Sequence, residues 1–296
     1  MFKITGKKLI APDTYWMDIE APRVAKSAKP GQFIIIRMGE KGERIPLTIC
    51  DYDVEKGTVS IVFQAIGTST KEMAKFEVGD SFLDFVGPLG TASEFTIEDE
   101  TELKNKKIMF IAGGVGTAPV YPQVKWLSEK GIKADVIIGS RNRELLILED
   151  EMKLVAGNVY PATDDGSYGY KGLVTNLLKQ LVQEEGKKYD VVVAIGPMIM
   201  MKFVTILTKE LGIKTIVSMN PIMVDGTGMC GACRLSIGGK IKFACVDGPE
   251  FDGHLVDFNE AMRRQTIYKT EEAKVEFRKS EEHEGGCGCC GGKNNG

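Results

Sequence analysis

The sequence predicts a multidomain fold: an antiparallel β-barrel, then a doubly wound parallel α/β sheet, then a small cysteine-rich module. Short apolar runs separated by turn residues fill residues 1–97, which is typical of a barrel. Apolar strands alternate with amphipathic helices over residues 98–222, as in a parallel sheet covered on both faces. Cysteines gather among glycines in residues 223–258, and residues 259–296 predict a polar helix and a flexible tail.

Length, charge and composition exclude several classes of protein. The chain has 296 residues, 43% of them hydrophobic, and a net charge of −3, so no basic field is present to recruit nucleic acid or an anionic membrane. The longest apolar stretch, Val191 to Met201, is too short to span a bilayer, and the N-terminus has no signal-peptide pattern. We therefore expect a cytoplasmic protein with no membrane or nucleic-acid partner.

The barrel segment contains four apolar runs that predict strands, with turn residues such as Pro30-Gly31 and Lys56-Gly57 between them. A helix is expected over Thr70–Phe76. The four predicted strands are Phe33–Met38, Ile45–Ile49, Val59–Gln64 and Phe82–Val86.

Several polar groups in the barrel have the order that a flavin site needs. Arg44 can clamp a pyrophosphate, and the hydroxyl of Thr48, four residues on, can reach a ring edge. An apolar wall would follow on the next strand, and a Gly-Thr-Ser-Thr helix start could cradle phosphate. An isolated arginine on a strand more often marks a solvated face, so it is the order that favours FAD. The candidate residues are Arg44, Pro46, Leu47, Thr48, Ile61, Val62, Phe63, Gly67, Ser69 and Thr70.

The middle of the chain predicts alternating strands and helices. Strands are expected at Lys107–Ala112, Ala134–Gly139, Val159–Ala162, Val191–Ile195 and Thr215–Ser218. Helices are expected at Ala118–Lys130, Gly172–Gln183 and Met198–Leu211.

Four loops at the carboxyl ends of these strands predict a dinucleotide site, because ligands bind at that edge of a parallel sheet. The first loop is rich in glycine, although it lacks the G-x-G-x-x-G pattern. Any one of these loops could be simple turn chemistry, and it is the set of four that favours a nicotinamide nucleotide. Arg141 leaves the choice between NAD(H) and NADP(H) open. The candidate residues are Gly113, Gly114, Gly116, Thr117, Arg141, Asp165, Gly196, Pro197 and Met198.

The cysteine module has the spacing Asp225-x4-Cys230-x2-Cys233-x11-Cys245. Three thiolates plus one further ligand can hold a [2Fe–2S] cluster, and close glycines let backbone N–H groups approach it. Asp225 stands where the first cysteine of a C-x4-C-x2-C run would be. The alternatives are a structural zinc site on the same cysteines and a simple turn role for Asp225.

Together, Arg44-Ile45-Pro46-Leu47-Thr48, Gly113-Gly114-Val115-Gly116-Thr117 and the Asp225–Cys245 module resemble the ferredoxin reductase-like flavoproteins over residues 1–258. The nearest likeness is to the small subunits of NADH-dependent reduced ferredoxin:NADP oxidoreductases. These have Asp at the position of Asp225, whereas the related electron-transfer subunits of dihydroorotate dehydrogenase have a fourth cysteine there.

The resemblance implies FAD on the barrel, NAD(H) at the Gly113–Thr117 turn and a [2Fe–2S] cluster on Asp225, Cys230, Cys233 and Cys245. It implies a larger partner subunit with flavin and [4Fe–4S] clusters that binds NADP, with ferredoxin reached through the complex and electron bifurcation as the reaction. Another oxidoreductase assembly using the same module, or a zinc-binding interaction protein, is the alternative. No catalytic side chain is predicted, and the role of Cys287, Cys289 and Cys290 is left open.

Overall fold

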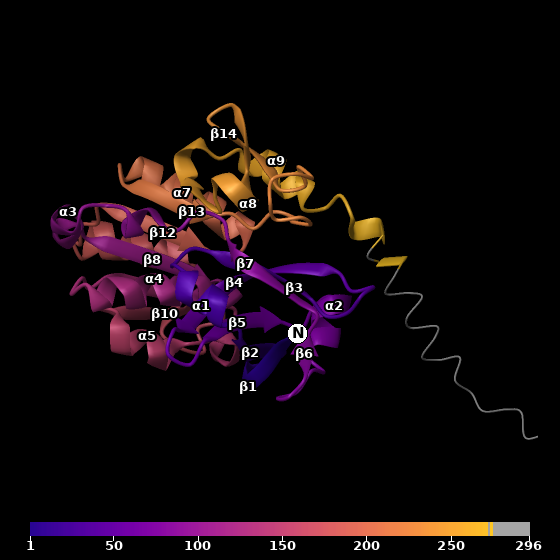
Figure 1. Cartoon of the computed structure of the whole chain (residues 1–296). Coiled ribbons are helices and arrows are strands. Elements are labelled where there is room, and N and C mark those ends of the chain that lie inside the picture. The colour runs from indigo at the N-terminus through magenta and orange to yellow at the C-terminus, as the bar shows by residue number, and fades with distance from the viewer. Residues whose placement is uncertain (272, 275–296) are drawn as a thin grey trace, which may run out of the picture.

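The computed structural model describes residues 1–271, 273 and 274, so the three tail cysteines lie outside the described residues. In Figure 1 the strands of the N-terminal barrel lie to the right and the α/β sheet lies to the left. The orange to yellow segment with β14, α8 and α9 lies above them. The three predicted parts are therefore all present.

The N-terminal sheet is antiparallel throughout, which confirms the predicted barrel. Two short helices, α1 (Pro22–Ser27) and α2 (Thr68–Met73), accompany it. Two long strands at the N-terminus were not predicted. In spatial order the strands are β6 (Ser81–Phe82), β1 (Phe2–Ala11), β2 (Thr14–Glu20), β5 (Thr58–Gln64), β4 (Arg44–Asp53), β3 (Phe33–Arg37) and β7 (Asp84–Leu89).

The second sheet is parallel except at one edge, where β16 runs antiparallel to β13. That edge strand comes from the predicted cysteine module, so the module contributes a strand to the sheet and is not a separate unit beside it. In spatial order the strands are β11 (Tyr170–Lys171), β10 (Val159–Thr163), β9 (Asp135–Ser140), β8 (Ile108–Gly113), β12 (Val191–Ile195), β13 (Lys214–Ser218) and β16 (Glu250–Asp252). The helices of this part are α3 (Glu100–Asn105), α4 (Thr117–Glu129), α5 (Glu149–Val155), α6 (Val174–Lys179) and α7 (Met198–Glu210).

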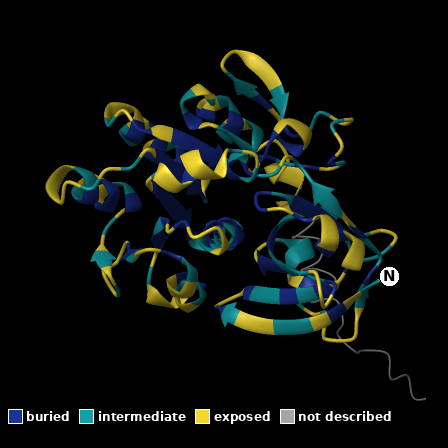
Figure 2. Ribbon diagram, turned by 60° about the vertical axis from the view of Figure 1, so that its left-hand side comes forward, coloured by how far each residue is buried: buried dark blue, intermediate teal, exposed yellow. Residues whose placement is uncertain are grey.

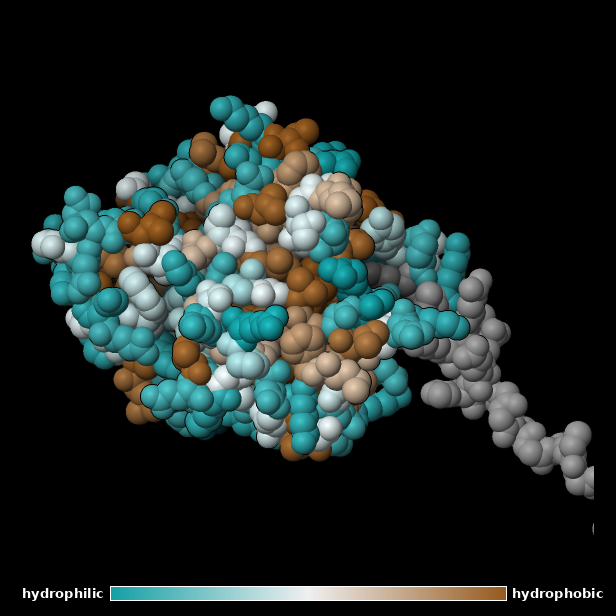
Figure 3. Space-filling view, viewed as in Figure 1, coloured by the Kyte–Doolittle hydropathy of each residue, from teal (hydrophilic) through white to brown (hydrophobic). Residues whose placement is uncertain are grey.

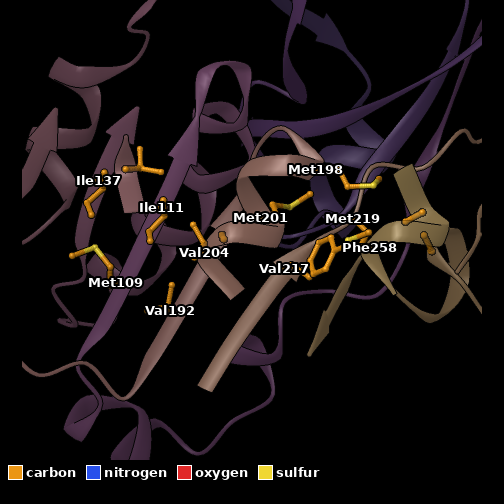
Figure 4. Close-up of a cluster of buried hydrophobic side chains, with 14 of the residues drawn as sticks. Met109, Ile111, Ile137, Val192, Met198, Met201, Val204, Val217, Met219 and Phe258 are labelled. Carbon is orange, nitrogen blue, oxygen red and sulfur yellow. The ribbon is translucent and has the colours of Figure 1, made fainter. Parts of the chain in front are cut away.

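The parallel sheet is apolar on both faces because alternate residues of each strand enter different cores. On β8, Met109 and Ile111 enter one core, and Phe110 enters the other. Figure 4 shows the first core, where Met201 and Val204 of α7 lie over the sheet. In Figure 2 the central strands are dark blue, as expected for strands buried on both faces. None of the described helices combines the length and the apolar composition needed to cross a membrane.

The cysteine module is built from a two-stranded hairpin and short helices. The hairpin pairs β14 (Arg234–Ile237) with β15 (Lys240–Phe243) in antiparallel register. The helix α8 (Ala244–Asp247) follows directly, and α9 (Phe258–Arg264) packs on β14 and α7. The module shares its core with the parallel sheet, because Cys233, Cys245 and Phe258 belong to the same cluster as Met109 and Ile111.

Candidate functional site

Arg44, the predicted pyrophosphate clamp, begins β4 and reaches across to the cysteine module. Its Nε donates to the carbonyl of Val224 at 2.9 Å, and its Nη2 donates to the carbonyl of Asp225 at 3.1 Å. Three of the five guanidinium N–H groups remain for another ligand. The candidate flavin strand is thus tied directly to the segment that carries the candidate cluster ligands.

The other predicted flavin residues divide by strand alternation. On β4, Pro46, Leu47 and Thr48 are all half-buried, so each retains surface that a ligand could contact. On β5, Ile61 and Phe63 point into the barrel core and are at most 1% exposed. The expectation that these two side chains form a wall for the flavin is therefore wrong.

Val62 faces the opposite way from its two neighbours because successive side chains of a strand alternate. It packs in a small cluster with Cys50 of β4 and Ala118 of α4. This cluster joins the barrel to the parallel sheet that carries the candidate nucleotide site. Lys125 of α4 reinforces the joint, since its Nζ lies 2.7 Å and 2.9 Å from the two carboxylate oxygens of Asp51.

The predicted phosphate cradle lies at the start of α2. Gly67 N donates to the hydroxyl of Thr70 at 3.1 Å, and that hydroxyl donates back to Gly67 O. The Ser69 hydroxyl donates to the carboxylate of Glu43. These polar side chains therefore already have local partners, and their role toward a flavin phosphate stays a prediction.

The glycine turn after β8 is shaped by contact with the neighbouring strand end. A Cβ on Gly116 would lie 2.3 Å from the carbonyl oxygen of Ile195, and one on Gly113 would lie 2.5 Å from Met200 Sδ. Only glycine permits this approach. The side chain of Thr117 is fully buried and donates to Gly114 O at 2.9 Å, so it holds the turn rather than facing solvent.

The loop after β12 lies directly beside that turn, as predicted from the order of the strands. A Cβ on Gly196 would lie 3.0 Å from Gly113 Cα. Pro197 precedes the first turn of α7, and Met198 is buried in the core below. The glycines of the two loops thus meet at the carboxyl edge of the sheet, whereas the Met198 side chain points away from it.

The loops after β9 and β10 also meet at this edge of the sheet. Asp165 N donates to Arg141 O at 3.2 Å, and both side chains are exposed. Ser167 donates hydrogen bonds to the carboxylate of Asp165 from its hydroxyl and from its backbone N–H. These bonds, the hydroxyl first, hold the pKa of that carboxyl below its ordinary value. Sequence reasoning missed a neighbouring pair, in which the Arg143 guanidinium stacks 4.2 Å from the ring centroid of Tyr168.

Two of the predicted cluster ligands lie side by side. Cys233 and Cys245 are each 2% exposed, and their Sγ atoms are 3.2 Å apart with no disulfide between them. Burial, together with the hydrogen bond and charge of the Cys233 thiol, raises the pKa of Cys245 to about 12. Burial therefore keeps the Cys245 thiol protonated in the metal-free protein, and two sulfur atoms this close together can ligate one metal site once a metal ion displaces the proton.

The other two predicted ligands lie on the preceding loop. Cys230 is exposed, and the N–H of Ala232 lowers the pKa of its thiol. The carboxylate of Asp225 accepts hydrogen bonds from the hydroxyl and the N–H of Thr227, the latter at 2.9 Å, and these lower its pKa. Within the described part of the chain, no three His, Cys, Asp or Glu side chains converge tightly enough to hold a metal ion as they stand.

The donor set nevertheless fits a [2Fe–2S] cluster. Three thiols and a carboxylate supply four ligands, and each thiol has a lower affinity for its proton once iron is bound. Gly231, with a φ of +66°, makes the tight turn between Cys230 and Cys233 that brings backbone N–H groups toward the sulfur atoms. The assignment of Asp225 as the fourth ligand stays a prediction.

Sequence reasoning also missed a buried carboxyl group at the junction of all three parts. Glu250 of β16 accepts a hydrogen bond from Gln123 Nε2 of α4 at 2.7 Å, and Gln123 Oε1 accepts from the hydroxyl of Ser93, which follows β7 of the barrel segment. The other carboxylate oxygen is buried without a partner among the described residues. Burial raises the pKa of Glu250 to about 7. A lone glutamate before a phenylalanine gave no signal in the sequence.

Comparison with known families matches two of the three parts. Residues 220–257 match the iron–sulfur cluster binding domain of dihydroorotate dehydrogenase B, and residues 110–205 match an oxidoreductase NAD-binding domain. The first match contains all four predicted cluster ligands, and the second contains the four predicted nucleotide loops.

Known relatives match nearly the whole chain. An uncharacterized protein of Clostridium beijerinckii is 64% identical over 99% of this chain and 100% of its own length. A dihydroorotate dehydrogenase B (NAD⁺) electron transfer subunit homolog of Thermotoga maritima is 46% identical over 94% of each chain. A solved structure of NADH-dependent reduced ferredoxin-NADP oxidoreductase, described for flavin-based electron bifurcation, contains a chain with 44% identity and a TM-score of 0.86. That match covers 94% of this chain and 97% of that one.

Proposed function

This chain belongs to the family of dihydroorotate dehydrogenase B electron transfer subunits and their homologues, and on that premise we propose that it moves electrons between NAD(H), FAD and a [2Fe–2S] cluster. We further propose that it does so as the small subunit of an NADH-dependent reduced ferredoxin:NADP oxidoreductase. The likeness to a bifurcating oxidoreductase over 94% of the chain supports this choice over a role in dihydroorotate oxidation.

One observation carries the proposal: Arg44 joins the candidate flavin strand to the candidate cluster segment. Its two hydrogen bonds, to the carbonyls of Val224 and Asp225, connect residues that are 180 and 181 positions apart in the chain. Electron transfer requires its carriers to be close together and fixed, and this contact fixes the two parts to each other.

A bound FAD supplies the conversion between the hydride chemistry of a nicotinamide and the single-electron chemistry of an iron–sulfur cluster. The protein contributes position and charge. The glycine turns at Gly113–Gly116 and Gly196 allow a dinucleotide to approach the backbone at the sheet edge. Arg44 offers its remaining donors to a pyrophosphate, and the half-buried Pro46, Leu47 and Thr48 offer a surface for the ring.

A protein partner is also part of the proposal. Next to the exposed Cys230 the module presents Met229 at 86% exposure, and Val224 on the same loop and Val246 of α8 are exposed as well. In Figure 3 hydrophobic side chains are exposed among hydrophilic ones in the upper part of the molecule, where Figure 1 places β14 and α8. Apolar side chains around a redox-active thiol suit a larger subunit that covers them.

The test is anaerobic purification of the full chain together with whatever polypeptides bind it. We expect flavin and iron–sulfur absorption bands that bleach when NADH is added, and a [2Fe–2S] signal by electron paramagnetic resonance that appears on reduction. Co-purification of a larger flavoprotein with [4Fe–4S] clusters that reduces NADP⁺ would support the oxidoreductase assignment. A partner that oxidises dihydroorotate would replace that assignment, and a colourless protein that contains zinc would refute electron transfer altogether.

A further inference from the structure

The helix α9 packs against β14 of the cysteine module and against α7. Phe258 and Ala261 are buried in the core that contains Cys233 and Cys245, and Figure 4 shows Phe258 beside Val217 and Met219. At the start of the helix, Asp257 N donates to Ser236 O of β14 at 2.9 Å. The helix is therefore fixed relative to the cysteines at its N-terminal end and along its buried face.

The last residue of α9, Arg264, reaches the loop between two predicted ligands. Its Nη2 donates to the carbonyl of Ala232, next to Cys233, at 3.1 Å. Its Nε is buried and has no hydrogen-bond partner among the described residues. Within that same part of the chain, Arg264 forms no ion pair. A buried cationic donor without a partner is costly unless a negative group lies close to it.

The negative charge that would offset this cost is that of the loaded iron–sulfur site. Three thiolates and one carboxylate would concentrate negative charge at this site, and three of these ligands, Asp225, Cys230 and Cys233, lie on the loop that Arg264 touches. The other cations near the loop differ from Arg264 in position or exposure. Lys242 Nζ lies 3.1 Å from Asp247, Arg44 lies at the Asp225 end of the loop, and Arg234, next to Cys233, is exposed to solvent. Arg264 thus provides a guanidinium with a buried Nε at the Cys233 end.

We propose that Arg264 is a positioning residue of the iron–sulfur site, which fixes the Cys230–Cys233 loop through the carbonyl of Ala232 and offsets the negative charge of the bound cluster. The proposal rests on the proposed function, because it requires the cluster to be present. One-electron reduction adds a negative charge to the cluster, so a nearby guanidinium stabilises the reduced form more than the oxidised form. Removal of this charge should lower the reduction potential.

The test compares Arg264→Gln with Arg263→Gln in the full chain purified with its partner. Arg263 is the adjacent residue of the same helix and is exposed, so the second variant makes the same change in net charge without touching the loop. In a redox titration followed by electron paramagnetic resonance, R264Q should have a lower cluster potential than the wild type, and R263Q should match the wild type. Arg264→Lys, which keeps the positive charge, should have a cluster potential close to that of the wild type. Equal potentials in R264Q and R263Q would overturn the proposal.

A second measurement decides the matter if R264Q takes up no cluster. In cluster-free protein, the rate of alkylation of Cys233 reports on the position of the loop. We expect R264Q to react several-fold faster than the wild type, with R263Q unchanged, because the anchor at Ala232 is lost. Equal rates in all three proteins would refute the positioning role. A wild-type protein without a [2Fe–2S] signal would instead refute the proposed function and this inference with it.

Discussion

Asp225 has two competing uses for one carboxylate. It accepts hydrogen bonds from Thr227 and from the N–H of Met229, the latter at 3.4 Å, and it is also the proposed oxygen ligand of the cluster. These bonds and the nearby charge of Arg44 keep the carboxylate ionised, since all of them lower its pKa. An ionised carboxylate is the form that binds iron, so the local bonds prepare the ligand as well as compete for it.

Asp225→Ala should therefore lose most of its cluster and keep its FAD, because the flavin candidates lie on the barrel. Asp225→Cys, which restores a four-thiolate set, should keep the cluster. The measurement is the iron and flavin content of each anaerobically purified variant, with the visible spectrum as a second readout.

Asp247→Ala is the matched control, since Asp247 Oδ2 accepts from Phe243 N at 2.7 Å in the same module without being a predicted ligand. A normal cluster content in D225A would show that Asp225 is only a turn residue. Loss of iron in D247A to the same extent would show that any disturbance of the module releases the cluster.

At this scale the sequence predicted residue types better than side-chain directions. The Cys233–Cys245 pair could be expected from spacing, because glycines and cysteines carry chemistry that few other patterns share. Ile61 and Phe63 could not be separated from Val62, because an apolar run buried on both faces has no polar positions to reveal its alternation. Thr117 was expected at the ligand, but its hydroxyl closes the turn.

Among the elements, the contact between the β8–α4 turn and the β12–α7 loop sets the geometry of the nucleotide edge. Gly116→Ala places a Cβ 2.3 Å from the carbonyl oxygen of Ile195, which is backbone and cannot turn aside. We expect the free energy of unfolding to fall by about 1–3 kcal/mol. Affinity for NADH should also fall, because the two loops must separate.

Urea denaturation and NADH titration check this expectation. Gly39→Ala is the control, because no atom lies within 4 Å of the place that the added methyl group would occupy, and the φ of Gly39 is not positive. If G116A binds NADH as tightly as G39A does, the turn is not part of the nucleotide site.

The strands predicted from the sequence have continuous apolar runs. The two long strands that were missed, β1 and β2, carry both polar and apolar side chains along the strand. β1 contains Lys3, Lys7 and Lys8, and its buried positions are sparse, so it shows no clean alternation. β2 keeps Asp18 at the sheet surface, where Trp16 Nε1 and Ser60 Oγ donate to its carboxylate at 2.7 Å and 2.6 Å. Such strands form because of their partners, which a local pattern does not contain.

For the whole molecule, the segment 248–250 holds the three parts together. Thr91 N donates to Gly248 O at 2.7 Å from the barrel side, and Met219 N donates to Pro249 O at 2.9 Å from the sheet. Glu250 then reaches Gln123 of α4. The sequence predicted three parts but not this junction, because contacts between residues far apart in the chain leave no local pattern.

The pKa of Glu250 makes the stability of this junction depend on pH. The folded protein holds the proton up to a pKa of about 7, whereas the unfolded chain releases it near the ordinary value of 4.5. Between these values unfolding releases a proton, so this group lowers the free energy of unfolding as the pH rises, by about 3 kcal/mol in all, and the effect levels off about one pH unit above the folded pKa.

Glu250→Gln keeps an acceptor for Gln123 and carries no charge, so it should remove this dependence of the stability on pH. The stability of E250Q relative to the wild type should therefore grow from about pH 4.5 to about pH 8 in urea titrations, while Glu55→Gln, at an exposed position, should change little at any pH. If the wild-type and E250Q curves run parallel, then water or a neighbouring group satisfies the buried oxygen, and the junction does not respond to pH.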